Sequence, residues 1–367
     1  MKFVISRDAL ITPLNLVAGV VERRQTLPIL ANVKLVLDGD RLSLTGTDLE
    51  VELVGRVQLA QAGDSGEVTV PARKLVDICK SLPEGSDIQF LAEEGKVTVK
   101  SGRSRFTLST LPAREFPSVE DSLGTHQFTI KQGQLKRLIE RTAFAMAQQD
   151  VRYYLNGMLW EIKSGQLRVV ATDGHRLAMC TLPSSVDAGG DAQVILPRKG
   201  VLELSRLLLE DDADIAIVIG SNHIRANTTD FTFTSKLVDG KFPDYERVLP
   251  RAADKIVHGS RLELRQAFTR TAILSNEKYR GVRLKLTTDT LEIVANNPEQ
   301  EEAEELVAVQ YAGDSLEIGF NVSYLLDVLG VLSGEQIKMS LADPNSSALL
   351  EESEDGDSLY VVMPMRL

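Results

Sequence analysis

The fold is decided by a pattern that occurs three times: Leu44-Thr-Gly-Thr-Asp48, Val170-Ala-Thr-Asp173 and Val294-Ala-Asn-Asn297. Each copy is the end of an apolar, strand-like run that closes on a polar pair. The polar pairs lie about 125 residues apart along the chain. That period is too long for a solenoid repeat and matches the size of a whole domain.

The same order of elements surrounds each copy of the pattern. A helical pattern precedes it, starting near Ser6, Lys131 and Ser260, and a second helical pattern follows it, starting near Pro71, Pro197 and Phe320. Alternating strand patterns fill the remainder of each copy. The sequence therefore predicts an α+β fold of three tandem domains, each with two helices packed on antiparallel sheets. Their predicted bounds are 1–125, 126–252 and 253–367.

Composition indicates an ordinary globular chain, with 43% hydrophobic and 25% charged residues. Apolar runs stay well short of the roughly 20 residues of a membrane span, and the first residues do not form a signal-peptide pattern. Cys79 and Cys180 lack CxxC or metal-ligand spacing, so we expect buried thiols in a reducing cytoplasm.

The formal net charge of −11 is concentrated in one part of the chain. Lys and Arg number 15 against 17 Asp and Glu in residues 1–125, and 16 against 15 in residues 126–252. Residues 253–367 carry 10 against 20. Such asymmetry is informative about partners rather than fold, and it leaves the first two repeats free to meet a polyanion.

Basic residues accompany five of the six predicted helices. In the first helix of the second repeat, Leu135, Leu138, Ile139 and Thr142 mark the buried stripe, and Lys136, Arg137 and Arg141 fall outside it. Equivalent cations occur on or beside the other helices, at Arg24, Arg73, Lys74, Lys80, Arg198, Lys199, Arg206, Arg265 and Arg270. For one helix a solvated face explains this, but the repetition favours a shared positive surface that binds phosphates without reading sequence.

A ring of such helices encloses duplex DNA only if two chains contribute. Helices pack about 10 Å apart, so six of them give a circumference of about 60 Å, which is too tight. Twelve helices give about 120 Å and roughly 28 Å of clear width. B-DNA is about 20 Å wide, so a two-chain ring of six domains with helices lining the hole fits it.

The two ends of the chain carry complementary strands. The first repeat has the basic and apolar run Arg103-Ser-Arg-Phe-Thr-Leu108, and the third has Ile273-Leu274 beside the acidic run 299–305. An acidic run by itself is usually a solvated surface. Here its counterpart lies at the opposite end of the same chain, which favours head-to-tail dimerisation into a closed ring.

These features resemble a known family along the whole chain, the bacterial sliding clamps that form the β subunit of DNA polymerase III. Within the first repeat the resemblance rests on Thr26-Leu-Pro-Ile-Leu30, Val70-Pro-Ala-Arg-Lys74 and Ser101-Gly-Arg-Ser-Arg-Phe106. Further along it rests on Gln149-Asp-Val-Arg-Tyr-Tyr154, Ala171-Thr-Asp-Gly-His-Arg-Leu177, Ser235-Lys-Leu-Val-Asp-Gly-Lys-Phe-Pro-Asp-Tyr245 and Tyr360-Val-Val-Met-Pro-Met-Arg-Leu367. The chain resembles the proteobacterial members of this family.

The resemblance implies a homodimeric ring that slides on duplex DNA without sequence specificity. It implies a processivity factor without catalysis or cofactor, placed in the cytoplasm at the nucleoid. Implied partners are the clamp loader, the α subunit of the replicative polymerase, translesion polymerases, mismatch-repair proteins and ligase, and no membrane. The chain has no Gly-x-x-x-x-Gly-Lys-Ser/Thr loop of its own, which is consistent with a passive clamp.

The resemblance also assigns site residues. It places duplex DNA against Arg24, Arg73, Gln149, Tyr153, Tyr154 and Lys199. It places a partner peptide, with a glutamine and a hydrophobic end, against Leu155, Thr172, Gly174, His175, Arg176, Leu177, Pro243, Arg247, Val248, Ser347, Val361, Val362, Met363, Pro364 and Met365. Asn345 is expected at the rim of that pocket. It places the dimer interface at Lys74, Arg103, Arg105, Phe106, Leu108, Ile273, Leu274, Glu299, Glu301, Glu302, Glu304 and Glu305.

Two rival functions and one alternative for the tyrosine pair stay open at this point. Asp173 and His175, with Ser184-Ser185 nearby, have the residue types of a hydrolase. The equivalent places in the other repeats, Thr47-Asp-Leu-Glu50 and Asn296-Asn-Pro-Glu299, have no histidine. A turn after a strand explains the shared polar pair without chemistry. For Tyr153-Tyr154 the alternative to base stacking is ordinary strand packing of one of the two rings. A three-domain protein scaffold that never touches DNA is the second rival function.

Overall fold

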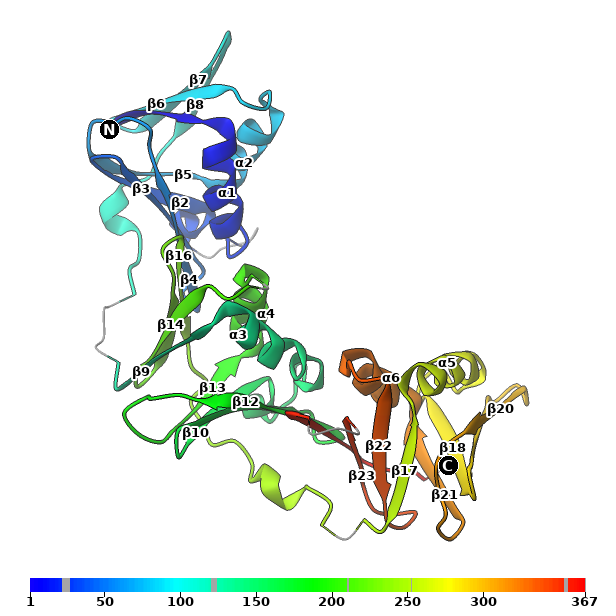
Figure 1. Cartoon of the computed structure of the whole chain (residues 1–367). Helices are drawn as coiled ribbons and strands as arrows, with labels where there is room; N and C mark the ends of the chain where they lie inside the picture. The colour runs from blue at the N-terminus through cyan, green and yellow to red at the C-terminus, as the bar shows by residue number, and fades with distance from the viewer. Residues whose placement is uncertain (22–26, 120–123, 210, 252, 353–355, 367) are drawn as a thin grey trace. The chain divides into compact units, whose positions relative to one another are not determined.

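The computed structural model describes the whole chain except residues 22–26, 120–123, 210, 252, 353–355 and 367. Within the described residues it contains six α-helices and 24 β-strands in four antiparallel sheets (Figure 1). The helices are α1 (Arg7–Ala18), α2 (Ala72–Ser81), α3 (Gln132–Glu140), α4 (Arg198–Leu207), α5 (Arg261–Thr271) and α6 (Val322–Val331). All six begin within a few residues of the predicted starts, which confirms the α+β fold.

The strands form two sheets of four and two sheets of eight. Across one small sheet the order is β1 (Lys2–Ser6), β6 (Asp87–Glu93), β7 (Lys96–Ser101) and β8 (Ser104–Ser109). Across the other it is β20 (Glu302–Ala308), β19 (Thr290–Asn296), β18 (Gly281–Thr287) and β21 (Leu316–Asn321). The first large sheet is β5 (Gly66–Pro71), β2 (Asn32–Asp38), β3 (Arg41–Thr47), β4 (Val51–Gln58), β16 (Phe231–Lys236), β15 (His223–Asn227), β14 (Asp214–Ile219) and β9 (His126–Lys131). The second is β13 (Ala192–Pro197), β10 (Gly157–Lys163), β11 (Gln166–Thr172), β12 (Arg176–Ser185), β24 (Ser358–Val362), β23 (Ala348–Glu352), β22 (Gln336–Leu341) and β17 (Lys255–Ser260).

Each large sheet joins strands of two neighbouring repeats. In the first, β4 pairs with β16, so that Phe231 lies opposite Gly55. In the second, β12 pairs with β24, so that Cys180 lies opposite Ser358. The chain accordingly divides into two compact units, one formed by 1–133, 187–189 and 199–237, and the other by 134–186, 190–198 and 238–367. Each shared sheet lies within one unit.

The first helices of the first and third repeats begin with the same cap. Ser6 accepts a hydrogen bond from the backbone N–H of Ala9 at 3.2 Å, and Ser260 accepts one from Glu263 at 3.4 Å. A serine in this position satisfies a backbone donor that has no partner inside the helix. In these two repeats the first helix then packs beside the second, α1 on α2 and α5 on α6.

The core follows the predicted apolar pattern. Leu135, Leu138 and Ile139 of α3 are buried, as are both cysteines, which are free thiols. Burial raises the pKa of each thiol to about 11, so both stay protonated and unreactive at neutral pH. No helix among the described residues has the length and apolar content needed to cross a lipid bilayer.

Candidate functional site

The turn after β11 is held together by its own polar side chains. Asp173 Oδ1 accepts hydrogen bonds from the backbone N–H groups of His175 at 2.9 Å and Arg176 at 3.1 Å. Thr172 Oγ1 donates to the carbonyl oxygen of Arg176 at 2.6 Å and accepts from the N–H of Gly174 at 3.1 Å. Gly174 has a φ of +88°, a conformation that glycine adopts without steric cost.

The equivalent turn of the first repeat has the same hydrogen bonds. Asp48 Oδ1 accepts from the N–H groups of Glu50 and Val51, and Thr47 Oγ1 donates to the carbonyl of Val51 at 2.9 Å. Asp173 is thus used for backbone capping and for an ion pair with Arg176, with Nε and Oδ2 3.2 Å apart. This favours the structural interpretation of the Asp–His motif over the hydrolase one.

Arg176 joins this turn to α6. Its Nη1 forms an ion pair with Asp327, and its Nη2 donates to the carbonyl oxygen of Phe144 at 2.9 Å. The guanidinium also lies over the ring of Tyr324, 4.5 Å from the centroid, and that ring stacks beside His175 at 6.5 Å. Arg176 therefore fixes the turn of the second repeat against a helix of the third.

Next to this turn lies an apolar floor on one face of the second eight-stranded sheet. Its buried members are Ala147, Leu155, Leu159, Val170, Leu177, Met179, Ile195, Phe242, Tyr245 and Val361. Phe242 and Tyr245 belong to residues 238–249, a segment that we call the strap. The strap also contains Pro243, Arg247 and Val248, and it is attached to the floor at Val238 and Leu249 as well. The last strand leads back to the turn, because the N–H of Met363 donates to the carbonyl oxygen of His175 at 2.9 Å.

The structure thus gathers most of the predicted peptide-pocket residues around one floor in one compact unit. Leu155, Leu177 and Val361 form part of the floor, and the 172–176 turn flanks it. The strap and residues 363–366, which we call the tail, supply most of the others. Val362 of β24 lies opposite Arg176, so its side chain points to the other face of the sheet from Val361. Ser347 directly precedes β23, whose first residue, Ala348, lies opposite Val362. Asn345 lies in a tight turn, where its N–H donates to Asp343 at 2.8 Å. The tail continues with Met365, whose N–H donates to the carbonyl oxygen of Gly319 at 2.8 Å.

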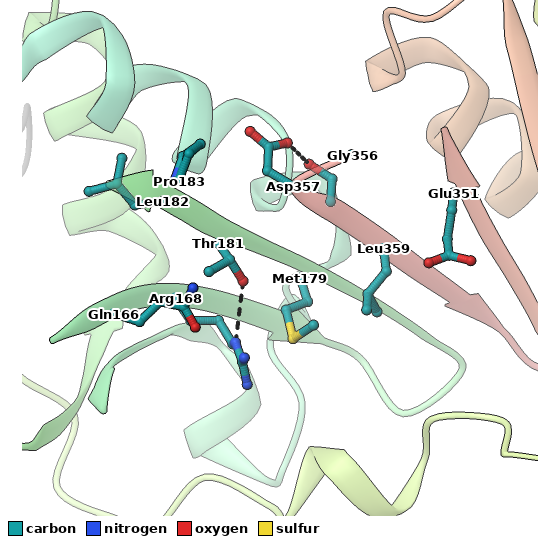
Figure 2. Close-up of a pocket in the computed structure, with 11 residues that line it drawn as sticks. Gln166, Arg168, Met179, Thr181, Leu182, Pro183, Glu351, Gly356, Asp357 and Leu359 are labelled. Atoms are coloured by element: carbon teal, nitrogen blue, oxygen red, sulfur yellow. Dashed lines mark hydrogen bonds between the residues drawn. The ribbon is translucent and has the colours of Figure 1, made fainter. Parts of the chain in front are cut away.

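A cavity of about 390 Å³ lies on the same sheet and was not predicted from the sequence (Figure 2). Met179 and Leu359 line it, and Figure 2 shows Arg168 hydrogen-bonded to Thr181 within it. Met179 and Leu359 lie two residues from Leu177 and Val361 along the same strands, so the cavity and the predicted pocket share one face. Its lining comes from strands β11, β12, β23 and β24 and from residues 356 and 357, which lie far apart in the chain, so the sequence alone does not bring these residues together.

The loop that precedes β10 carries three of the predicted DNA-binding residues. Gln149 adopts a φ of +54°, and Tyr153 and Tyr154 lie in a 3-10 turn, η4 (Tyr153–Leu155), rather than in a strand. Tyr153 is 57% exposed, whereas Tyr154 is partly buried against the apolar floor. The strand-packing alternative was therefore wrong about the element, and one ring of the two does pack against the core.

The remaining DNA-binding candidates belong to the other unit or lie outside the described residues. Arg73 is exposed on α2. Lys199, near the start of α4, forms an ion pair with Asp48, so part of its charge is already compensated. Arg24 lies outside the described residues.

One cation of the predicted positive surface is instead buried. Arg141 is 6% exposed and donates to Glu352 at 2.9 Å and to Ser333 at 2.6 Å. The prediction for Arg141 was wrong because helical periodicity shows only which face of the helix packs on the core of its own repeat. It does not show whether another repeat covers a second face. Here the third repeat covers a second face of the helix. Arg137 is more exposed, yet it also pairs with a carboxylate of the third repeat, Asp357, at 3.0 Å.

Except for Lys74, which is exposed on α2, the predicted interface residues lie on or next to two sheet edges. β8 is the edge of the first small sheet and carries Arg105, Phe106 and Leu108, while β20 is the edge of the other. Leu108 is already buried within the chain, whereas Ile273, in η6 (Ala272–Leu274), is 75% exposed. Glu305 is paired with Arg270 at 2.5 Å, and Leu306 of β20, which was not predicted, is 65% exposed. Unpaired edges with exposed apolar residues are suited to strand addition.

Three tandem copies of one α+β pattern, joined by two shared eight-stranded sheets and carrying an apolar floor beside a capped turn, define a class of protein built from repeated whole domains. Comparison with known families then identifies which one. The DNA polymerase III beta subunit families match the chain in three consecutive pieces: the N-terminal domain over residues 1–120, the central domain over 129–244 and the C-terminal domain over 246–366. The chain belongs to the DNA polymerase III beta subunit family.

Individual relatives align with this chain along their whole length. The chain is 67% identical to the Beta sliding clamp of Pseudomonas aeruginosa and 55% identical to that of Escherichia coli K12, with 100% of each chain covered. Among solved structures, a sliding clamp from Pseudomonas aeruginosa bound to griselimycin superposes with a TM-score of 0.98 at 67% identity, covering 100% of both chains.

Proposed function

We propose that this chain is a DNA sliding clamp that works as a homodimeric ring around duplex DNA and tethers the replicative polymerase to its template. The clamp function follows from family membership, because relatives that share two thirds of its residues over their full length carry that name. Family members are non-catalytic processivity factors, so this chain is proposed to act by binding partner proteins and by encircling DNA.

The tether acts through effective concentration. A polymerase held on the ring remains close to the primer end after it lets go, so rebinding outcompetes diffusion. Sequence-independent sliding requires contacts to phosphates rather than to base edges. Lysine, arginine and glutamine side chains supply such phosphate contacts. The proposed DNA contacts are Arg24, Arg73, Gln149, Tyr153, Tyr154 and Lys199. The exposure of Arg73, Tyr153 and Gln149 supports three of them.

Ring closure is proposed to occur edge to edge, with β8 of one protomer beside β20 of its partner. Each edge strand is terminal in its sheet, and the charges on the two are opposite, basic on β8 and acidic on β20. Ile273 and Leu274 of η6 supply the apolar part of the contact, together with the exposed Leu306 of β20 itself. The charges orient the two protomers, and the apolar residues provide most of the affinity.

Partners are proposed to bind through the apolar floor between the 172–176 turn, the strap and the tail. A short peptide with a glutamine and a hydrophobic end suits an apolar site with a few fixed polar groups. The clamp loader, the polymerase α subunit, translesion polymerases, mismatch-repair proteins and ligase are proposed to share this pocket. We place this work in the cytoplasm, at the nucleoid.

The single observation that carries the proposal is the full-length match over all three domains. The test combines sedimentation with retention on nicked circular DNA, in the presence of a clamp loader and ATP. A dimer of about twice 40.3 kDa that stays on circles and is lost once the circles are cut demonstrates topological linkage. A monomer, or retention that ignores DNA ends, refutes the ring and leaves the protein-scaffold alternative.

A further inference from the structure

A row of polar side chains crosses four neighbouring strands beneath the strap. Gln193 of β13 lies opposite Glu161 of β10, Glu161 opposite Arg168 of β11, and Arg168 opposite Thr181 of β12. Directly opposite residues of antiparallel strands point to the same face, so these four side chains form one row. Figure 2 shows the end of that row, with Arg168 hydrogen-bonded to Thr181 beside Met179.

The next row on this face, two residues further along each strand, is entirely apolar. It consists of Ile195, Leu159, Val170 and Met179, and all four belong to the floor of the predicted pocket. One row further along, Thr172 lies opposite Leu177, and both are predicted pocket residues. The polar row therefore lies two rows from the pocket, under the same strap.

Tyr245 is the residue that connects the strap to the polar row. Its hydroxyl donates to Glu161 Oε2 at 2.5 Å and accepts from Arg168 Nη1 at 2.9 Å. The other carboxylate oxygen of Glu161 accepts from Gln193 at 2.5 Å. Meanwhile the ring of Tyr245 is buried in the apolar floor. We call Glu161, Arg168, Gln193 and Tyr245 the brace.

The brace holds a buried charge that apolar packing alone does not require. Glu161 is 5% exposed, and a carboxylate in that position is costly unless its oxygens are hydrogen-bonded. Burial raises the pKa of Tyr245 to about 12, with the hydrogen bond to Glu161 acting in the same direction. The hydroxyl therefore remains a donor throughout the physiological pH range.

The strap residues beside Tyr245 are those predicted to line the pocket. The N–H of Val248 donates to the carbonyl oxygen of Tyr245 at 3.0 Å, and the N–H of Arg247 to that of Asp244 at 3.4 Å. These bonds form the short turn η5 (Tyr245–Arg247), so the position of Tyr245 determines where Arg247 and Val248 lie. Val248 is 39% exposed and available for contact.

We propose that Tyr245, anchored by Glu161 and Arg168, is a positioning residue. It fixes the position of the strap relative to the apolar floor, and thereby the affinity of the pocket for partner peptides. The inference rests on the proposed peptide pocket, and it assigns the brace a role without contact to the peptide. Removing the hydroxyl leaves the ring in the floor but leaves one oxygen of Glu161 without its donor. The strap then loses the hydrogen bonds that hold Tyr245 to Glu161 and Arg168.

The test compares Tyr245→Phe with Tyr311→Phe as a matched control. Tyr311 is equally buried, at 4% against 5%, and its hydroxyl donates to the carbonyl oxygen of Asp314 at 2.5 Å, far along the chain from the strap. Affinity is measured by fluorescence anisotropy, with a labelled short peptide that carries a glutamine and a hydrophobic end. Hydrogen exchange of the strap is measured on the same proteins without peptide.

We expect Tyr245→Phe to bind the peptide about five- to tenfold more weakly, as the loss of one buried hydrogen bond implies. Exchange at the Arg247 and Val248 amides should accelerate, while Tyr311→Phe leaves both readouts unchanged. Glu161→Gln keeps an acceptor for the hydroxyl but removes the charge of the carboxylate, so its peptide affinity and strap exchange should lie between those of wild type and Tyr245→Phe. If Tyr245→Phe does not fold, Glu161→Gln provides the test. Wild-type affinity and wild-type strap exchange in both brace variants would overturn the proposal. A wild-type chain that does not bind the peptide refutes the pocket instead, and strap exchange still reports on the brace.

Discussion

The guanidinium of Arg152 donates from Nη2 to the carbonyl oxygen of Asp173 at 3.2 Å. The same guanidinium is bound by Asp150, with Nε and Nη2 at 3.0 Å and 2.9 Å from its two oxygens. The loop with the DNA-contact candidates Gln149 and Tyr153 is thereby joined to the turn that flanks the peptide floor. A bidentate arginine–carboxylate pair is geometrically well defined, so it can hold the loop and the turn in one arrangement.

Arg152→Ala should weaken peptide binding by about fivefold, because the turn loses a fixed hydrogen bond to its backbone. Fluorescence anisotropy with the labelled peptide measures this. Arg283→Ala is the matched control, since it also removes an arginine from an exposed ion pair, the one with Glu317 at 3.1 Å. Equal affinity in the two variants would show that Arg152 does not support the turn.

The Arg152 contact also predicts a titration shift. The side-chain hydrogen bond from Arg152 lowers the pKa of Asp150 to about 2. In the Arg152→Ala protein that pKa should rise toward the ordinary aspartate value of about 3.9, as followed by NMR between pH 2 and pH 6. An unchanged pKa would mean that the pair does not persist in solution.

The ion pair between Arg141 and Glu352 makes acid stability depend on one carboxylate. Burial alone raises the pKa of Glu352, but the Ser333 backbone N–H and the Arg141 guanidinium outweigh it and lower the pKa to about 2. A carboxyl whose pKa is depressed in the folded state stabilises fully above its unfolded pKa of about 4.3 and progressively less as pH falls toward 2. Wild-type protein should therefore lose unfolding free energy across that window.

Glu352→Gln should flatten this part of the pH profile, as measured by urea unfolding at a series of pH values. At neutral pH, Arg141→Ala should destabilise the fold by roughly 3 kcal/mol, because the Glu352 carboxylate, whose side chain is 17% exposed, loses its counter-charge and keeps only its hydrogen bonds from Ser333. Glu317→Gln, which removes the carboxylate of an exposed ion pair, should leave the profile unchanged. If the pH profile of Glu352→Gln matched that of wild type, the ion pair would not be the source of the acid sensitivity.

Ile273→Ala combined with Leu274→Ala should convert the proposed dimer into monomers. Ile273 exposes three quarters of its surface in the single chain, so its removal affects association more than folding. Analytical ultracentrifugation measures the mass. Leu262→Ala, which alters a leucine of the same repeat that is 55% exposed, serves as the control. A dimer that persists in the double variant would refute the interface.

Gln149→Glu with Arg73→Glu should reduce loading onto circular DNA while the mass of the dimer stays unchanged. Both changes add negative charge at proposed phosphate contacts, and the salt dependence of binding should become shallower as those contacts are lost. Arg114→Glu, an exposed cation in the 3-10 turn η2 (Ala113–Glu115), outside the helices, is the control. Undiminished loading would mean that these residues do not face the DNA.

The helices and the repeat could be predicted from the sequence because local signals encode them. Serines at 6 and 260 cap α1 and α5, and the polar pairs at 47–48 and 172–173 form the same turn. Arg141 could not be predicted, since its burial depends on Glu352, which lies 211 residues away. The brace was missed for a related reason. Glu161, Arg168 and Gln193 look like solvent-facing strand residues until a distant segment covers them.

The pairing of β12 with β24 has a consequence for how the chain is made. Cys180 and Ser358 are 178 residues apart, and the pairing of β4 with β16 brings together Arg56 and Thr232, 176 residues apart. On the ribosome, β4 and β12 therefore emerge long before their neighbours exist and present open backbone edges to other nascent chains. Contacts of such long sequence separation also form slowly. We expect this chain to depend on chaperones that shield strand edges during synthesis more than its ordinary composition suggests.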